Sequence, residues 1–138
     1  MVVETEGDFW LLLAMMVLLF PLEITAGILL AAAVHELGHI LSIRIIGGRI
    51  RRLVLRPGGA TLETDVMTPG RELFSALAGP VVGALTIAAW RFFPALAVAG
   101  LVQTLFNLLP VYPLDGGRAL RAAGILVSAC STEQLKSQ

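Results

Sequence analysis

Long apolar runs are the feature that most restricts what this 138-residue chain can fold into. A helix needs about 20 apolar residues to cross the roughly 30 Å hydrocarbon core of a bilayer. The runs at 24–46, 73–90 and 94–113 meet or approach that length, and the 57% hydrophobic and 14% charged content is too apolar for an ordinary soluble domain. The sequence therefore predicts an all-α polytopic membrane protein, folded as a single domain over residues 1–138.

A fourth apolar run, 9–22, is shorter than the others. Its 14 residues would reach only about 21 Å as a helix, so it spans with help from its flanks or lies partly in the interface. Counting this run gives about four transmembrane helices. A removable signal peptide over residues 1–22 is the alternative, which the missing basic start and the missing cleavage site disfavour.

Basic residues are distributed unequally between the two sides of the predicted membrane protein. Nine of the ten flank or occupy the segment between the runs 24–46 and 73–90, or follow the last run, and only Arg91 lies in the opposite connection. By the positive-inside rule, the segment at 47–71 and the C-terminus are cytoplasmic. This orientation belongs to a multi-pass protein with the lipid bilayer as its solvent, and a bacterial cell membrane is its expected location.

The polar segment at about 49–66 reads as a small cytoplasmic-side β-hairpin. Ile50–Leu55 and Ala60–Val66 are β-prone, and Pro57–Gly59 between them is typical of a turn. A surface loop whose arginines touch anionic headgroups is the alternative, and the two descriptions are compatible.

Proline and glycine interrupt the last two runs. Pro80 follows Ala78 and Gly79, small residues that let helices approach closely. Further along, two prolines and the pair Gly116-Gly117 predict an unwound segment near 114–117, in the last span. Residues 119–130 could then form one more short helix, too short to span.

The segment from His35 to His39 carries the chemistry. In a helix, residues four apart differ by only about 40° around the axis, so the two imidazoles project from one face and can share a metal ion. Glu36 lies beside them, placed to take a proton from a water that the metal acidifies. This pattern predicts a zinc-dependent peptidase site.

The position of these residues within an apolar run strengthens that interpretation. Ionisable groups at such depth cost several kcal/mol each, so they mark a functional site by default. The alternative is a buried polar cluster that joins helices, but it would need three costly groups where one serine or asparagine would serve.

Two histidines leave zinc short of ligands, and the chain has no third histidine. Asp115 is the best candidate because it lies where Pro113 and Gly116-Gly117 break the last run, and irregular backbone at membrane depth must line a cavity or be buried. The alternative is an ordinary Asp-Gly turn residue. Four other acidic residues lie at span ends or in the polar segment, where solvated charges are expected: Glu23, Glu63, Asp65 and Glu72.

Asn107 lies eight residues before Asp115 in the same run. Its amide could hold a substrate carbonyl or stabilise the oxyanion of a tetrahedral intermediate. A hydrogen bond between helices is equally compatible with the sequence.

Together these residues resemble the site-2 protease family of intramembrane zinc metalloproteases, peptidase family M50. The resemblance rests on His35 to His39, on Ala78-Gly79-Pro80, and on the segment from Asn107 to Gly116, and the compact layout is most similar to the stage IV sporulation protease branch. It implies that His35, His39 and Asp115 bind one Zn²⁺ per chain. It further implies that Glu36 is the catalytic base, that Asn107 binds substrate or stabilises the transition state, and that the active site lies toward the cytoplasm.

The expected function is cleavage of a membrane-protein substrate in or near a transmembrane segment, for regulated proteolysis in signalling or transcription-factor activation. No nucleic acid is expected as a partner, whereas regulatory membrane proteins or further copies of the chain are compatible with the sequence. An inactive zinc-binding scaffold that holds client helices is the first alternative. A metal transporter is the second, which the lack of further polar residues along a path disfavours.

Overall fold

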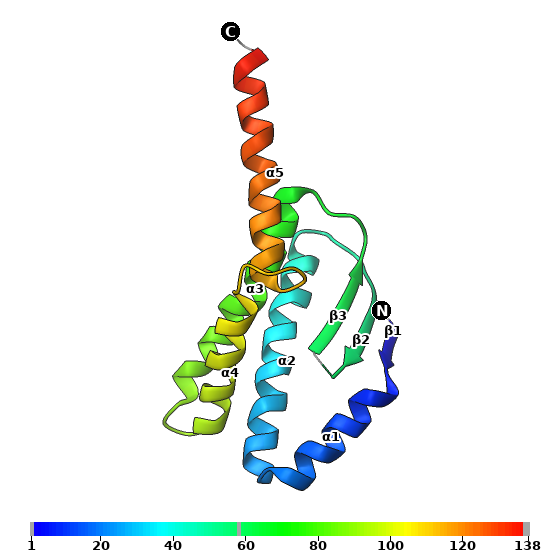
Figure 1. Ribbon diagram of the computed structural model, residues 1–138, viewed down its shortest axis with the longest axis vertical. Coiled ribbons are helices and arrows are strands. Elements are labelled where there is room, and N and C mark those ends of the chain that lie inside the picture. Colours follow the sequence, from blue (N-terminus) through cyan, green and yellow to red (C-terminus); the bar gives the residue numbers. More distant parts are fainter. Residues whose placement is uncertain (1, 58, 137–138) are drawn as a thin grey trace.

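The computed structural model describes residues 2–57 and 59–136, with a small sheet beside a group of helices (Figure 1). In chain order the elements are β1 (Val2–Thr5), α1 (Gly7–Leu19), α2 (Leu22–Ile45), β2 (Ile50–Arg56), β3 (Gly59–Thr64), α3 (Pro69–Ala84), the 3₁₀ helix η1 (Leu85–Ala89), α4 (Pro94–Asn107) and α5 (Asp115–Lys136). Helix predominates, and the antiparallel pair β2 and β3 confirms the predicted hairpin.

Two helical segments of the described chain are long and apolar enough to cross a membrane. They are α2, with 24 residues, and Pro69–Ala89, with 21 residues, which joins α3 to η1. Helices α1 and α4 are apolar but shorter, at 13 and 14 residues. The arrangement of four spans therefore stays a prediction.

The two ends of α2 follow from local sequence. Helix α1 stops before Phe20 because a proline disfavours helical backbone in the residue that precedes it, and Pro21 then leads directly into α2. At the other end, Gly47 adopts a φ of 75°. Its N–H donates to the Arg44 carbonyl at 3.1 Å, and the Gly48 N–H donates to the Ile43 carbonyl at 2.8 Å. These two bonds form a Schellman motif, which turns the chain out of α2 toward the hairpin.

The break in the last apolar run lies earlier than predicted. Helical structure in the run 94–113 ends at Asn107, and irregular chain covers 108–114 rather than 114–117. Both prolines of the stretch lie in this irregular chain, where neither removes a helical hydrogen bond. In the third run, by contrast, α3 continues through Pro80 to Ala84.

Gly116 and Gly117 lie in the first turn of α5, so the prediction that they unwind the chain is wrong. A Cβ atom added at Gly116 would sit 2.2 Å from the Leu108 carbonyl oxygen. Glycine is therefore needed for close packing of α5 against the preceding loop. The prediction of a short helix at 119–130 underestimates its length, since α5 has 22 residues.

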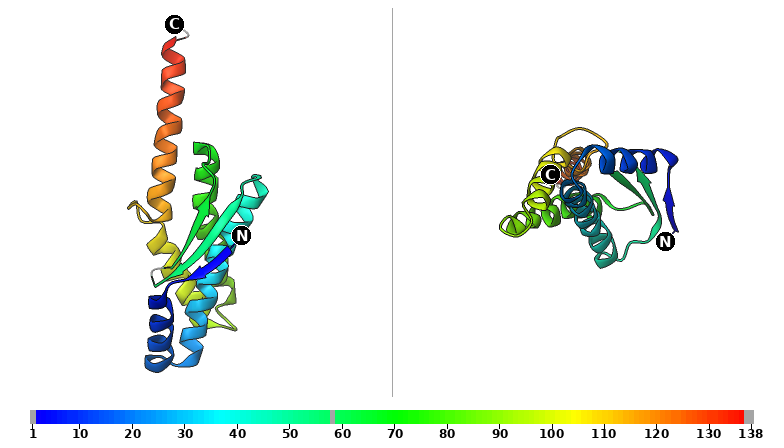
Figure 2. Two further views of the ribbon diagram at one scale, coloured as in Figure 1. Left: turned by 90° about the vertical axis from the view of Figure 1, so that its right-hand side faces the viewer. Right: turned by 90° about the horizontal axis from the view of Figure 1, so that it is seen from below.

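The helices pack in a group that supports one end of α5. Helix α2 packs against α3 and α4, and α3 also packs against α5. Figures 1 and 2 show the sheet lying along one side of this group, while the C-terminal part of α5 extends away from it. The loop at 108–114 and the start of α5 lie about halfway along the long axis of the molecule (Figure 1).

The interior of this group is made of small side chains. Most of the buried hydrophobic residues are alanines, whereas many large apolar side chains face outward, including Leu18 at 84%, Leu22 at 74% and Phe92 at 76% exposure. Membrane helices associate through small residues because lipid removes the drive to bury large ones. This distribution fits a protein whose helices face lipid.

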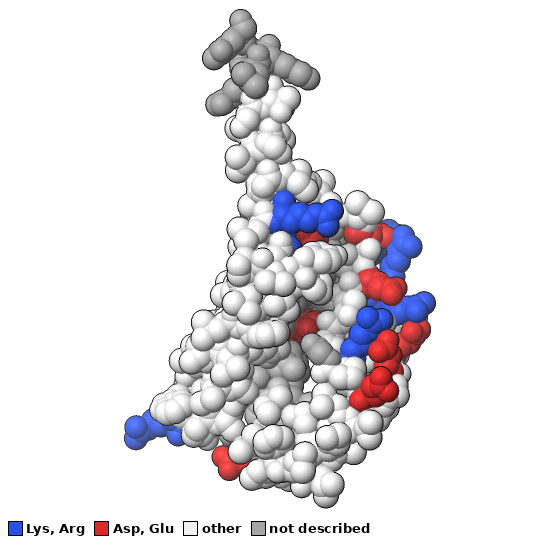
Figure 3. Space-filling model, in the orientation of Figure 1, with Lys and Arg blue, Asp and Glu red and all other residues white. Residues whose placement is uncertain are grey.

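The sheet contains a strand that the sequence analysis did not predict. Strand order is β1-β2-β3, with β1 parallel to β2. Glu4 pairs with Arg52 at 3.2 Å and Glu6 with Arg56 at 3.0 Å, and charged side chains gather over this sheet in Figure 3. The acidic residues near the N-terminus thus neutralise two arginines of the hairpin. The two acidic residues lie two positions apart and the two arginines four positions apart, as expected for side chains on one face of extended chain.

Gly27 tests the close contact between α2 and α4. A Cβ atom added there would lie 2.8 Å from the carbonyl carbon of Ala95, so Gly27→Ala should destabilise the protein by about 1–3 kcal/mol through overpacking. The measurement is the thermal unfolding midpoint of the purified chain in detergent micelles. Gly124→Ala on α5 is the control, because no atom lies within 4 Å of its added Cβ, and it should not lower the midpoint. Equal midpoints for the two variants would contradict this packing.

Candidate metal centre

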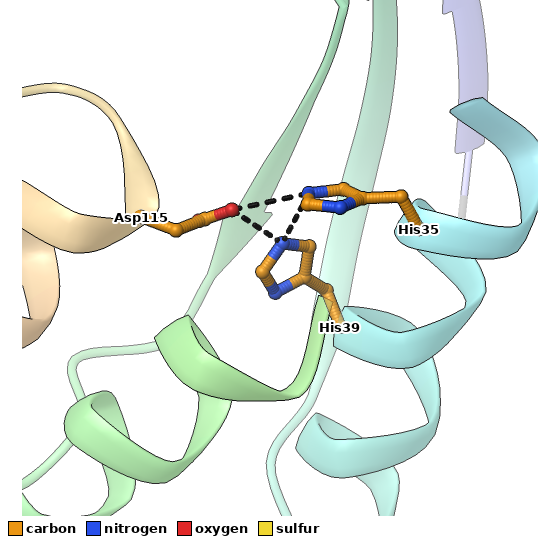
Figure 4. A group of neighbouring side chains, drawn as sticks. All are labelled: His35, His39 and Asp115. Atoms are coloured by element: carbon orange, nitrogen blue, oxygen red, sulfur yellow. Dashed lines mark hydrogen bonds and ion pairs between the residues drawn. The ribbon is translucent and has the colours of Figure 1, made fainter. Parts of the chain in front are cut away.

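His35 and His39 lie one turn apart on α2 and face the interior of the helix group (Figure 4). Both are buried, with 3% and 4% of their surface exposed. Their Nε2 atoms lie 3.2 Å apart. The helical spacing therefore converges the two imidazoles on one point, as the sequence pattern predicts.

Asp115, the first residue of α5, completes this group. Its Oδ2 atom lies 3.1 Å from Nε2 of His35 and 3.1 Å from Nε2 of His39, although 80 residues separate it from His35 in the chain. The side chain is 9% exposed. Because α5 begins where the irregular loop ends, the carboxylate is presented to α2 from a helix N-terminus.

The spacing of these three atoms suits a zinc ion. Zinc bonds of about 2.0–2.1 Å in tetrahedral geometry place neighbouring ligand atoms about 3.3 Å apart. The three separations in the structure are 3.1, 3.1 and 3.2 Å, and two imidazoles with one carboxylate form a donor set typical of catalytic zinc. The residues present therefore fit the metal that the sequence predicts.

A backbone contact orients His39 for this role. Its Nδ1–H donates to the Ser75 carbonyl of α3 at 2.8 Å, which leaves the lone pair of Nε2 free for a metal. Nδ1 of His35 is buried and has no hydrogen-bond partner in the described part of the chain. Sequence reasoning did not identify Ser75, because a backbone carbonyl leaves no signal in residue type.

Gly79 provides the space for the His39 ring. A Cβ atom at this position would lie 2.1 Å from Nε2 of His39, so every other side chain would collide with the ligand. At Gly83, one turn further along α3, an added Cβ would lie 3.0 Å from Oγ1 of Thr104 and 3.3 Å from Nδ1 of His35, which is a tight contact but not a collision with the ring. The small residues beside Pro80 thus serve the site as well as helix packing.

Glu36 lines the same cavity as the three candidate ligands. This cavity has a volume of about 680 Å³, within the usual range of about 300–1,000 Å³ for ligand pockets. Glu36 is half-buried, and strand β3 borders the cavity through Ala60 and Thr61. A carboxylate therefore borders this cavity beside the predicted metal position.

Asn107, at the C-terminal end of α4, also lies at this cavity. Its Nδ2 atom lies 3.4 Å from Nε2 of His35. The structure thus places all five predicted site residues together: His35, Glu36, His39, Asn107 and Asp115.

Two further charged residues lie at the edge of the group. Arg118 on α5 contacts Asp115 and also pairs with Glu72 of α3. Glu72, expected to be a solvated charge, is 31% exposed and is ion-paired with Arg118. The contact between Arg118 and Asp115 could have been predicted from the sequence, because the two residues lie three apart on a helix.

Comparison with known proteins identifies similar chains. The sequence model of peptidase family M50 matches residues 64–134, which include Asn107 and Asp115. A zinc metalloprotease of Methanocaldococcus jannaschii is 32% identical over 106 residues, covering 67% of this chain and 31% of the relative. Stage IV sporulation protein FB of Bacillus subtilis is 32% identical over 132 residues, covering 86% of this chain and 46% of the relative.

A solved structure shows the same fold. The site-2 protease from Methanocaldococcus jannaschii superposes with a TM-score of 0.73 at 27% identity, covering 88% of this chain and 66% of that one. These matches confirm the resemblance drawn from the motifs. The chain spans less than half the length of the two curated relatives.

Asp115→Asn tests the third ligand. The substitution keeps the size of the side chain but removes the negative charge and basicity that favour zinc, so zinc affinity should fall at least about tenfold. Titration against a competing chelator measures the change. Asp65→Asn is the control, since that carboxylate pairs with Arg51 on the hairpin, and it should bind zinc like the unmodified chain. Unchanged affinity in Asp115→Asn would exclude the residue as a ligand.

Proposed function

Because the chain belongs to peptidase family M50, we propose that it is an intramembrane zinc metalloendopeptidase that cleaves a membrane-associated protein in or near a transmembrane segment. The observation that carries this proposal is the convergence of two histidines and Asp115, at 3.1–3.2 Å, on a cavity that Glu36 also lines. Regulated proteolysis in signalling or transcription-factor activation is the biological role proposed for this reaction.

The position of the site along α2 supports cleavage within the membrane. At 1.5 Å per residue, His35 lies about 20 Å from the start of the helix at Leu22 and about 15 Å from its end at Ile45. The Ile45 end leads into the arginine-rich hairpin, which the positive-inside rule assigns to the cytoplasm. The site then lies inside the bilayer, nearer its cytoplasmic face.

Each residue of the site has a separate role in the proposed reaction. A zinc ion held by His35, His39 and Asp115, one per chain, would acidify a water and polarise the scissile carbonyl. Glu36 accepts the proton released as the peptide bond is attacked and returns it to the leaving amine. Asn107 donates a hydrogen bond to the carbonyl oxygen, where negative charge develops.

Strand β3 supports a mode of substrate binding. The sheet order leaves β3 paired on one edge only within the described chain, and Ala60 to Leu62 of this strand line the cavity. A helical peptide bond is hydrogen-bonded and shielded, so a substrate segment must unwind before it can react. An unwound segment could then pair with β3 by strand addition beside Glu36.

Glu36→Gln tests the proposed reaction. Loss of the general base should reduce cleavage about 10²–10⁴-fold while zinc stays bound, because glutamine keeps the shape but accepts no proton. Fragments of membrane-anchored proteins from cells with the unmodified or the variant chain are compared by proteomics. A protein cleaved only by the unmodified chain is then purified and assayed with both forms in liposomes.

The matched control is Glu23→Gln, which removes an exposed glutamate from the first turn of the same helix and should leave cleavage unchanged. Cleavage by Glu36→Gln at the unmodified rate would refute the assigned mechanism. A zinc-loaded chain that captures client helices and cleaves none would identify an inactive scaffold instead.

A further inference from the structure

The two carboxylate oxygens of Asp115 have different partners. Oδ2 faces the imidazoles, whereas Oδ1 accepts a hydrogen bond from Nη1 of Arg118 at 3.1 Å. Rotation about the Cβ–Cγ bond of an aspartate is broad and would exchange these oxygens at little cost. The contact with Arg118 therefore distinguishes one orientation of the ligand from the others.

Arg118 is itself held by a residue on another helix. Its Nε and Nη2 atoms donate to Oε1 of Glu72 on α3, at 2.9 and 2.8 Å. The planar guanidinium thus uses one edge for Glu72 and its remaining nitrogen for Asp115, an arrangement that a lysine ammonium cannot reproduce. Both side chains of the ion pair are about 70% covered, at 29% and 31% exposure, so solvent screens the contact less than at an open surface.

We propose that Arg118 is a positioning residue of the metal centre, and that Glu72 anchors it. Arg118 fixes the Asp115 carboxylate with Oδ2 toward the metal position, so the ligand set is arranged before the ion binds. This inference rests on the proposed function, because it assumes that Asp115 is a metal ligand. Outer-shell contacts of this kind commonly contribute about 10–100-fold to metal affinity.

Electrostatic repulsion alone predicts the opposite change in zinc affinity. The direction of the measured change therefore decides between repulsion and positioning. A guanidinium near a divalent cation repels it, so removal of Arg118 would tighten metal binding if repulsion dominated. If orientation dominates, removal weakens binding. Glu72 offsets much of the charge of Arg118, which favours the second outcome.

The experiment measures metal binding by the purified full chain in detergent micelles. Zinc affinity is obtained by competition with a chelator, and Co²⁺ added in place of zinc reports ligand geometry through its visible absorption. Arg118→Gln should weaken zinc about 10–100-fold and alter the Co²⁺ spectrum. Arg118→Lys should lose nearly as much despite its charge, and Glu72→Gln should lose less because the contact with Asp115 remains.

Arg121→Gln is the matched control, since it removes the same charge from the exposed side of the same helix. It should bind zinc like the unmodified chain. His39→Ala reports separately on the centre itself and should abolish binding.

Tighter or unchanged zinc binding in Arg118→Gln, together with loss of binding in His39→Ala, would overturn the positioning role and leave the proposed function intact. Full zinc affinity in Arg118→Lys would also overturn it, because charge would then suffice. If the unmodified chain binds no metal, both proposals fail. Should Arg118→Gln not fold, as judged by circular dichroism, Arg118→Lys and Glu72→Gln decide the outcome.

Discussion

Two imidazoles and a carboxylate within 3.2 Å of one another, inside a group of apolar helices, impose the strongest constraint on this molecule. Each ionisable group at membrane depth costs several kcal/mol unless it has a partner. The surrounding structure supplies those partners, since the Ser75 carbonyl orients His39 and the Arg118 guanidinium contacts Asp115. Helix positions, the break before α5 and the glycines on α3 are all consistent with keeping this polar group together.

The distribution of side-chain size follows from the same constraint. Alanine, glycine, serine and threonine occupy most of the interior, and large apolar residues face outward. Small residues let α2 and α3 approach until the His39 ring reaches the backbone of Gly79. A core filled with leucine would hold these helices too far apart for α2 and α5 to share one ion. Close packing is therefore a requirement of the site as well as a source of stability.

The sequence predicts those parts of the site that depend on local spacing or on scarcity. His35 and His39 face one another because they lie one helical turn apart, and Asp115 stands out because few ionisable residues lie near the apolar runs. The structure confirms the hairpin and places the predicted residues together. Strand β1 and the ion pair of Arg118 with Glu72 depend on contacts between distant segments, which spacing does not reveal. The prediction that the two glycines after Asp115 unwind the chain is wrong because glycine is found both where a helix breaks and where two backbones approach closely.

Helix α5 packs chiefly against α3, and its connection to α2 runs through Asp115 and the two histidines. An ion bound there would close a loop of 80 residues between His35 and Asp115, joining the first long helix to the last. Closing a loop of that length restricts the unfolded chain, so part of the binding free energy becomes folding free energy. The metal would then also act as a cross-link, so the assembly of the helices and the formation of the site would depend on the same metal–ligand bonds.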